Sequence, residues 1–154
     1  MKRLLTAIGM ALALLFVITA NAWAVEDNTE TLTIKGDGVS QEITFPRADL
    51  ESMTKGITQH TYSVTNNFPT DKVLYRRGVS LQYLLEQAGI KDTAKLLTFT
   101  SSDGYARSFT YQELLKDRRY YFGSNGSKTE VPAIIAFADS SKGFDSLSET
   151  DLVL

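Results

Sequence analysis

The chain has 154 residues, of which 43% are hydrophobic, and a formal net charge of −2; these values suit one globular domain and give no electrostatic reason to bind nucleic acid. It contains no cysteine, which excludes disulfides, thiolate metal ligands, iron–sulfur clusters and thiol nucleophiles. His60 is the only histidine, so a multi-histidine metal site is excluded and a Ser-His-Asp triad could use no other imidazole.

The first 24 residues predict a secretory signal peptide. Lys2-Arg3 precedes an apolar run from Leu4 to Ala20, and Ala22-Trp23-Ala24 offers the small side chains that a signal peptidase accepts. We expect cleavage after Ala24, which leaves residues 25–154 as a secreted or periplasmic domain with no stable membrane span. The alternative is a retained anchor, because the apolar run reaches the short end of the length that a spanning helix uses.

The next segments predict strands and one short helix. Residues 31–45 alternate around a Gly-rich turn and indicate a β-hairpin. Pro46 then opens a short helix over 47–53, since the missing N–H of proline is harmless there. Strands are expected over 58–65 and 72–76, joined by a loop at 66–71 that the Asn, Pro and Asp residues indicate.

The centre of the chain predicts the clearest helix, 81–88, with Ser80 as its N-cap, one apolar stripe and Gly89 as its stop. Residues 96–109 predict a second hairpin that turns at Ser101-Ser102-Asp103-Gly104. Thr110 and Glu113 have the spacing of a capping box at the start of a helix over 111–116.

The C-terminal third predicts less regular structure. Residues 117–122 are charged and then aromatic, and 123–128 indicate a flexible tip. The apolar run 131–137 predicts a strand buried on both faces, followed by a polar linker over 139–151 with one helical turn at 148–151. Residues 152–154 look like a strand just starting, so we expect either a fragment or a short, shielded final strand. The fold class is α+β, with hairpins, a mixed sheet and short helices.

A series of motifs follows in order between Val73 and Tyr105: Gly78-Val79-Ser80-Leu81, Leu84-Leu85, Ala88-Gly89-Ile90, Leu97-Thr98-Phe99 and Asp103-Gly104-Tyr105. This series resembles the molybdopterin-binding domain of the sulfite oxidase family, and Arg47-Ala48-Asp49-Leu50 is similar to the family's opening. The resemblance covers roughly 32–110 and implies the fold of that domain. Small exported proteins of uncharacterised activity are the relatives that it suggests. The family's domain continues with further strand, which implies truncation at Leu154.

The chain departs from this family at one chemical point. The family holds molybdenum through a cysteine thiolate just before the helix motif, where Val64 or Thr65 stands here. Neither side chain offers an anionic sulfur, so the resemblance implies the fold without the redox chemistry, and no metal ligated by protein sulfur.

The resemblance also implies cofactor-binding candidates around one cleft, between 62–70 and 101–107. The amides of Asn66 and Asn67 would bind a ring or a phosphate, or else they form a turn. Arg76 and Arg77 would clamp a phosphate or carboxylate, or else they are solvated at a strand end. The last candidates border the same cleft or belong to a plain hairpin turn, with Tyr105 as a pocket wall: Asp103, Tyr105 and Arg107.

Three further features have simple structural readings. A lone His60 in a strand is expected to be a hydrogen-bonded structural residue, with a ligand or acid–base role as the alternative. Tyr120-Tyr121-Phe122 is either a stacking platform or a cluster that packs under a loop. Asn125-Gly126-Ser127 matches the N-glycosylation pattern, which matters only in a eukaryotic secretory pathway.

Three functions follow from these observations. The first is a non-catalytic binding module for a molybdopterin-like pterin, another small anionic ligand, or a partner protein. The second is a molybdopterin-dependent oxidoreductase, or a subunit of one, that holds its cofactor without protein sulfur. The third is a structural domain on the cell surface. No catalytic residue and no metal ligand is assigned.

Overall fold

The computed structural model describes residues 30–64 and 72–154. The predicted signal peptide and its cleavage site lie outside these residues. The strands are β1 (Thr31–Ile34), β2 (Ile43–Pro46), β3 (Ile57–Val64), β4 (Lys72–Ser80), β5 (Leu96–Thr100), β6 (Ala106–Thr110), β7 (Tyr120–Phe122), β8 (Lys128–Glu130), β9 (Ile134–Ser140) and β10 (Ser148–Val153). The helical elements are α1 (Arg47–Ser52), α2 (Leu81–Gln87), a π-helical turn (Gln112–Lys116) and a 3-10 turn (Phe144–Ser146).

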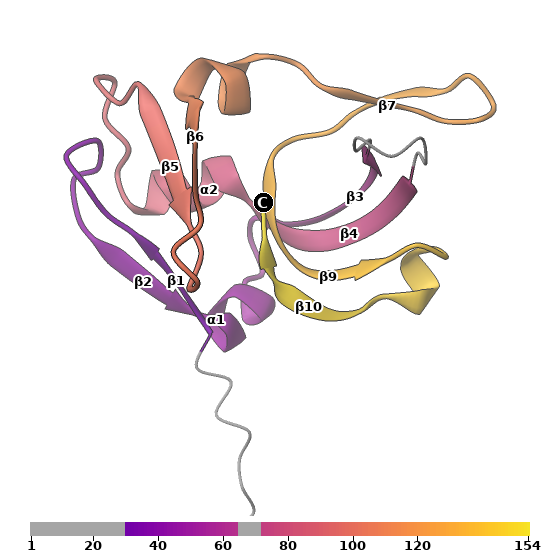
Figure 1. Ribbon diagram of the computed structural model, residues 1–154, viewed down its shortest axis with the longest axis horizontal. Coiled ribbons are helices and arrows are strands. Elements are labelled where there is room, and N and C mark those ends of the chain that lie inside the picture. Colours follow the sequence, from indigo (N-terminus) through magenta and orange to yellow (C-terminus); the bar gives the residue numbers. More distant parts are fainter. Residues whose placement is uncertain (1–29, 65–71) are drawn as a thin grey trace, which may run out of the picture.

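The strands form one larger antiparallel sheet and three separate hairpins. The larger sheet has the order β10-β9-β4-β3, and the hairpins are β1–β2, β5–β6 and β7–β8. In Figure 1 the hairpins β1–β2 and β5–β6 lie with α2 in one half of the molecule, and the larger sheet occupies the other half. A strand-rich mixture with short helices confirms the α+β class that the sequence predicts.

Local signals in the sequence explain α2 and its ends. Leu81, Leu84 and Leu85 are buried along one stripe, and the backbone N–H of Tyr83 donates to the Ser80 hydroxyl over 3.5 Å. At the C-terminal end, Gly89 adopts a φ of 67°, a left-handed conformation that favours glycine. The N–H of Ile90 then donates to the Leu85 carbonyl (3.0 Å), which completes a Schellman motif.

Both predicted hairpins and the predicted capping box are confirmed. β1 pairs with β2 in register from Thr31–Pro46 to Ile34–Ile43, and β5 pairs with β6 over five residue pairs. The N–H of Glu113 donates to the Thr110 hydroxyl and the N–H of Thr110 donates to the Glu113 carboxylate, each over 3.0 Å. The capped segment forms a π-helical turn in place of the expected α-helix.

Four predictions along the sheet and arm are wrong. β4 continues beyond Arg76 to Ser80, because pairing with β3 and β9 carries the strand through two charged residues and a glycine. The segment predicted as a polar linker contains the end of β9, a 3-10 turn and β10. β10 has a polar sequence, yet pairing with β9 makes it a strand in place of the helical turn expected at 148–151, and this strand ends at Val153 instead of starting at Leu152. The segment 117–130 forms the hairpin β7–β8, which is absent from the sequence expectations.

The core lies between the sheet and the helices. Leu50 of α1, Val79 of β4 and Leu84 of α2 are fully buried there. Gly78 allows β4 to approach β9, because a Cβ on this residue would lie 2.1 Å from the Ile135 carbonyl oxygen. Val131 and residues 134–137 are buried, which confirms the buried apolar strand, although Ala133 is only half-buried and the ladder itself begins at Ile134.

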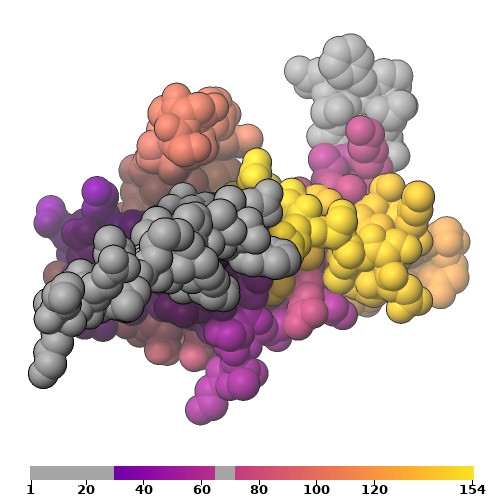
Figure 2. Space-filling model, turned by 90° about the horizontal axis from the view of Figure 1, so that it is seen from below, coloured from indigo at the N-terminus to yellow at the C-terminus, as the bar shows by residue number. Residues whose placement is uncertain are grey.

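The arm β7–β8 leaves the body of the protein. Figure 1 shows it extending over the end of β3 and β4, and in Figure 2 its light-orange atoms emerge at one end of the molecule beside the yellow C-terminal segment. Phe122 on this arm is 64% exposed. Of the helices formed by residues 30–64 and 72–154, none has the length and apolar character needed to cross a membrane.

Candidate functional site

Arg76 and Arg77 lie side by side in β4 and point to opposite faces of the sheet, because neighbouring residues of a strand alternate. Arg76 lies opposite His60 and Asp139, whereas Arg77 lies opposite Gln59 and Ala138. The two guanidinium groups therefore cannot clamp one phosphate together.

Arg77 lies in a shallow groove at the β9–β10 side of the sheet. Its guanidinium carbon is 5.9 Å from the centre of the Phe137 ring, a cation–π distance. The groove has a volume of about 250 Å³, and Glu51, Ser148 and Glu149 also line it. Within the described ranges, no hydrogen bond or ion pair engages the guanidinium of Arg77. The groove thus presents donors from Arg77 next to two carboxylates.

A bulge in β9 places Phe137 at this groove. Gly78 pairs with Ala136 and Arg77 pairs with Ala138, so Phe137 is an extra residue on β9. A bulge of this kind turns neighbouring side chains toward the same side of the sheet. The ring of Phe137 consequently lies beneath Arg77.

Arg76 is half-buried on the other face. Its Nη1 donates to the Leu154 carbonyl over 3.4 Å, and its Nε is buried with no partner among the described residues. On the same face the Tyr62 hydroxyl donates to the Pro132 carbonyl over 2.8 Å. Burial raises the pKa of Tyr62 to about 12, although nearby Arg76 and Arg119 act in the opposite direction. These contacts indicate a packed face and not an open binding site.

His60 has the environment of a structural residue. Its Nε2 lies 2.7 Å from the Thr58 hydroxyl, and its ring meets the Tyr62 ring edge-on at 6.3 Å. Burial lowers the pKa of His60, which keeps the imidazole neutral at pH 7. In the parts of the chain that the structure describes, no group of three His, Asp or Glu side chains is placed to hold a metal ion.

The three candidates of the β5–β6 hairpin lie in the half of the molecule away from the larger sheet (Figure 1). The Asp103 carboxylate accepts from the backbone N–H of Tyr105 (2.9 Å) and from the Ser101 hydroxyl, and this hydroxyl bond is the main reason that the pKa of Asp103 is lowered. Tyr105 is 66% exposed, and the Arg107 guanidinium stacks 4.9 Å from the Phe109 ring. Asp103 therefore stabilises the turn, and within the described chain no hydrogen bond joins these residues to Arg76 or Arg77. Asn66 and Asn67 lie outside the described residues.

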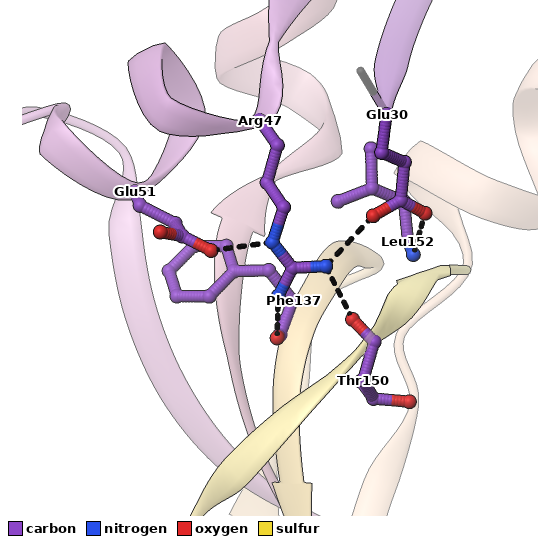
Figure 3. Close-up of polar contacts among 6 residues, drawn as sticks. All are labelled: Glu30, Arg47, Glu51, Phe137, Thr150 and Leu152. Carbon is purple, nitrogen blue, oxygen red and sulfur yellow. Dashed lines mark hydrogen bonds and ion pairs between the residues drawn. The ribbon is translucent and has the colours of Figure 1, made fainter. Parts of the chain in front are cut away.

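The sequence expectations omit a buried arginine, Arg47, which begins α1. Arg47 is only 4% exposed. Its guanidinium donates to the carboxylates of Glu51 (2.6 Å) and Glu30 (2.7 Å), as Figure 3 shows. It also donates to the carbonyls of Phe137 and Thr150 (2.7 Å each). Burial alone would lower the pKa of Arg47, but the bonds to the two carboxylates outweigh it and the pKa is raised.

Arg47 fills an interruption between β9 and β10. Glu149 pairs with Ala138 and Val153 pairs with Ala136, so the backbone between these pairs is out of register. Both carbonyls that Arg47 binds lie within the interruption, and the Glu30 carboxylate accepts from the Leu152 N–H over 2.6 Å. These contacts replace hydrogen bonds that the β9–β10 ladder lacks at the interruption. We call Glu30, Arg47, Glu51 and the backbone groups that they bind the Arg47 latch. The only sequence signal was an arginine at the first turn of a predicted helix.

The arm carries an aromatic face stacked with cations. The ammonium of Lys128 lies 3.9 Å from the Tyr120 ring centre and 5.9 Å from that of Phe122. Arg118 pairs with Glu130 across the arm, and this bond raises the pKa of Arg118 and lowers that of Glu130. These exposed contacts stabilise the hairpin locally.

Comparison with known proteins finds no match for this chain. No protein-family model, no curated protein and no solved structure matches the chain. The resemblance to the sulfite oxidase family therefore stays a prediction from the sequence motifs.

Proposed function

We propose that the chain is an exported, non-catalytic binding module whose domain resembles the molybdopterin-binding domain of sulfite oxidases. The observation that carries this proposal is the exposed guanidinium of Arg77, which lies above Phe137 beside Glu51 and Glu149. The occupant is a small planar polar ligand, such as a pterin ring, or a polar group on a partner protein.

The groove offers both hydrogen-bond donors and hydrogen-bond acceptors to a ligand. The planar guanidinium of Arg77 matches a carbonyl or carboxylate, and the carboxylates of Glu51 and Glu149 accept from amino or ring N–H groups. The ring of Phe137 offers an apolar wall. A pterin ring carries an acceptor oxygen next to N–H donors, so its chemistry matches this set.

Size and charge argue against a complete molybdopterin in this groove. A volume of about 250 Å³ lies below the roughly 300–1,000 Å³ of ligand pockets. Glu51 and Glu149 would also repel a phosphate, and Arg76 lies on the opposite face. The described residues of the groove do not fit the phosphorylated cofactor.

The composition supports the proposal of binding without molybdenum redox chemistry. With no cysteine in the chain, no thiolate is available to anchor molybdenum. The alternative proposals are an oxidoreductase that holds its cofactor by oxygen or nitrogen donors, and a structural surface domain. One molybdenum per molecule, in protein prepared with molybdate available, would establish the first alternative and reject the binding-only proposal.

A direct test uses purified protein expressed with its own N-terminus. Mass spectrometry of the native protein should show a bound small molecule, or pterin should raise its melting temperature in a thermal-shift assay. Arg77→Ala should weaken pterin binding about tenfold or more, because it removes charge-assisted hydrogen bonds. Arg118→Ala is the control, since Arg118 is an exposed arginine paired with Glu130 on the arm.

The proposal for a small ligand fails if no ligand is found and no pterin changes the melting temperature. Equal losses in Arg77→Ala and Arg118→Ala would show that binding depends on general positive charge and not on the groove. Phosphorylated pterin should bind no better than the free ring.

A further inference from the structure

The tip of the arm carries the only Asn-Gly sequence of the chain, Asn125-Gly126. The tip joins Phe122 of β7 to Lys128 of β8, and Asn125 and Gly126 are both exposed on it. In Figure 1 the loop at the end of this hairpin points away from the body of the protein. The side-chain amide of Asn125 is therefore accessible to water.

A hydrogen bond holds the Asn125 side chain over the peptide group that follows it. Its Oδ1 accepts from the backbone N–H of Ser127 over 3.0 Å, which forms an Asx-turn. Because this donor lies two residues on, the carboxamide folds over the peptide bond between Asn125 and Gly126. The Ser127 N–H also points at the oxygen on which negative charge develops when a nucleophile adds to the amide carbon. The bond therefore makes this carbon a better electrophile.

Gly123 leaves the space that this arrangement needs. A Cβ on Gly123 would lie 2.9 Å from the same Oδ1 of Asn125 and 2.6 Å from the Ser127 hydroxyl oxygen. A residue with a side chain would thus push the carboxamide out of its place. The glycine at the start of the tip favours the folded position of the amide.

Gly126 offers the nucleophile, its backbone nitrogen. Glycine has no Cβ to hinder the approach of this nitrogen to the neighbouring carboxamide. A Cβ on Gly126 would meet nothing within 4 Å, so the surroundings are open to solvent. The Gly126 N–H donates to the Gly123 carbonyl over 2.9 Å, and this bond has to open before the nitrogen reacts. Exposed turns with few packing contacts open at low free-energy cost.

We propose that Asn125-Gly126 is a site of spontaneous deamidation. The Gly126 nitrogen gives its proton to a base in solution and bonds to Cγ of Asn125, while the bond from Cγ to Nδ2 breaks. Nδ2 takes a proton from the solvent and leaves as ammonia, and a succinimide ring remains. Water then adds to either carbonyl of the ring and opens it to aspartate or to isoaspartate. No oxidant or reductant takes part.

The reaction changes both the charge and the backbone of the tip. Either product adds a negative charge beside Lys128, the first residue of β8. In isoaspartate the main chain runs through Cβ and Cγ, so the loop becomes longer by one backbone atom. The longer loop no longer fits the turn in which the Gly123 N–H donates to the Ser127 carbonyl over 2.9 Å. The arm therefore carries a chemical change that accumulates with time and opens its tip.

The test is peptide mapping by mass spectrometry of the purified protein after incubation at neutral and at mildly alkaline pH. Aspartate and isoaspartate should both appear at position 125, and faster at alkaline pH, because the nitrogen has to lose a proton. Asn66 and Asn67 are internal controls, since Asn67 and Phe68 follow them. They should convert at least about tenfold more slowly, because a Cβ hinders the following nitrogen.

Gly126→Ala tests the nucleophile and should slow the conversion about tenfold. The φ of 78° at this position strains an alanine and loosens the turn. Loosening by itself would speed the reaction, so slower conversion reports the hindered nitrogen. Ser124→Ala is the matched control, because it changes an exposed residue of the same loop and leaves both reacting groups in place.

Three results would overturn the proposal. The first is an Asn125 that stays unconverted at alkaline pH. The second is aspartate without isoaspartate, which would show direct hydrolysis of the amide with no succinimide. The third is equal rates in Gly126→Ala and Ser124→Ala.

Discussion

Arg47 and Arg77 both contact Phe137 at the bulge in β9, but Arg47 is buried and Arg77 is exposed. The Phe137 carbonyl accepts a hydrogen bond from buried Arg47, whereas the Phe137 ring lies beneath exposed Arg77. Arg47 has two carboxylates and two carbonyls as partners, and Arg77 has open donors in a groove. The same side chain thus serves structure in one region and is available for binding in the other. Surroundings, and not residue type, decide which role an arginine takes.

The largest expected effect is the loss of stability on replacing the buried arginine, compared with the exposed one. Arg47→Met removes the cation from a buried network and leaves Glu30 and Glu51 without it, so the free energy of unfolding should fall by about 3–5 kcal/mol. Arg77→Met should change it by less than about 0.5 kcal/mol, because that side chain is exposed. Urea denaturation of both variants measures the difference. Equal losses would show that the Arg47 latch does not hold β10.

The next effect tests how closely β4 and β9 approach near the bulge. Gly78→Ala forces a Cβ against the Ile135 carbonyl and should cost about 2 kcal/mol, because backbone has to move. Gly104→Ala in the β5–β6 turn meets no neighbouring atom but requires a φ of 86°, and it should cost about 1 kcal/mol. Thermal unfolding of the two variants gives the order, and a larger loss at Gly104 would contradict it.

A smaller loss of stability is expected at two helix N-caps, Thr110 and Ser80, which lie away from the bulge. Thr110→Ala removes the hydroxyl that accepts from the N–H of Glu113 over 3.0 Å and should cost about 1 kcal/mol. Ser80→Ala removes a bond of 3.5 Å and should cost only a few tenths of a kcal/mol, since that contact is long. Each loss should add to that of Arg47→Met, because distant sites behave independently. Non-additive losses would show that the caps and the latch unfold as one unit.

The smallest expected effect is the pH dependence of stability that His60 of β3 contributes. Burial lowers the pKa of His60 below its ordinary value of 6.5, so the unfolded chain binds the proton more readily than the folded chain. Stability should therefore decrease as pH falls through about 6.5, the ordinary pKa of histidine. His60→Gln should remove this decrease between pH 7.5 and about 5.5, above the range where carboxylates titrate. An unchanged pH profile in the variant would assign the proton to another group.

Elements with local signals were predictable from the sequence. Hydrophobic alternation and glycine turns predicted the two hairpins, and the leucine stripe with Ser80 and Gly89 predicted α2. These features involve residues close in the chain, so propensity and periodicity carry enough information. The sequence also determined that no thiolate chemistry is available, because composition alone excludes it.

Only the tertiary structure decided which polar residues became structural. β10 reads as linker because its strand character comes from pairing with β9, and Arg47 acquires its role from Glu30 and Thr150, which are far away in sequence. Likewise, the adjacent Arg76 and Arg77 gained different surroundings from the pleat of β4 and the bulge in β9. Long-range pairing sets these environments, and no local pattern of residues encodes them.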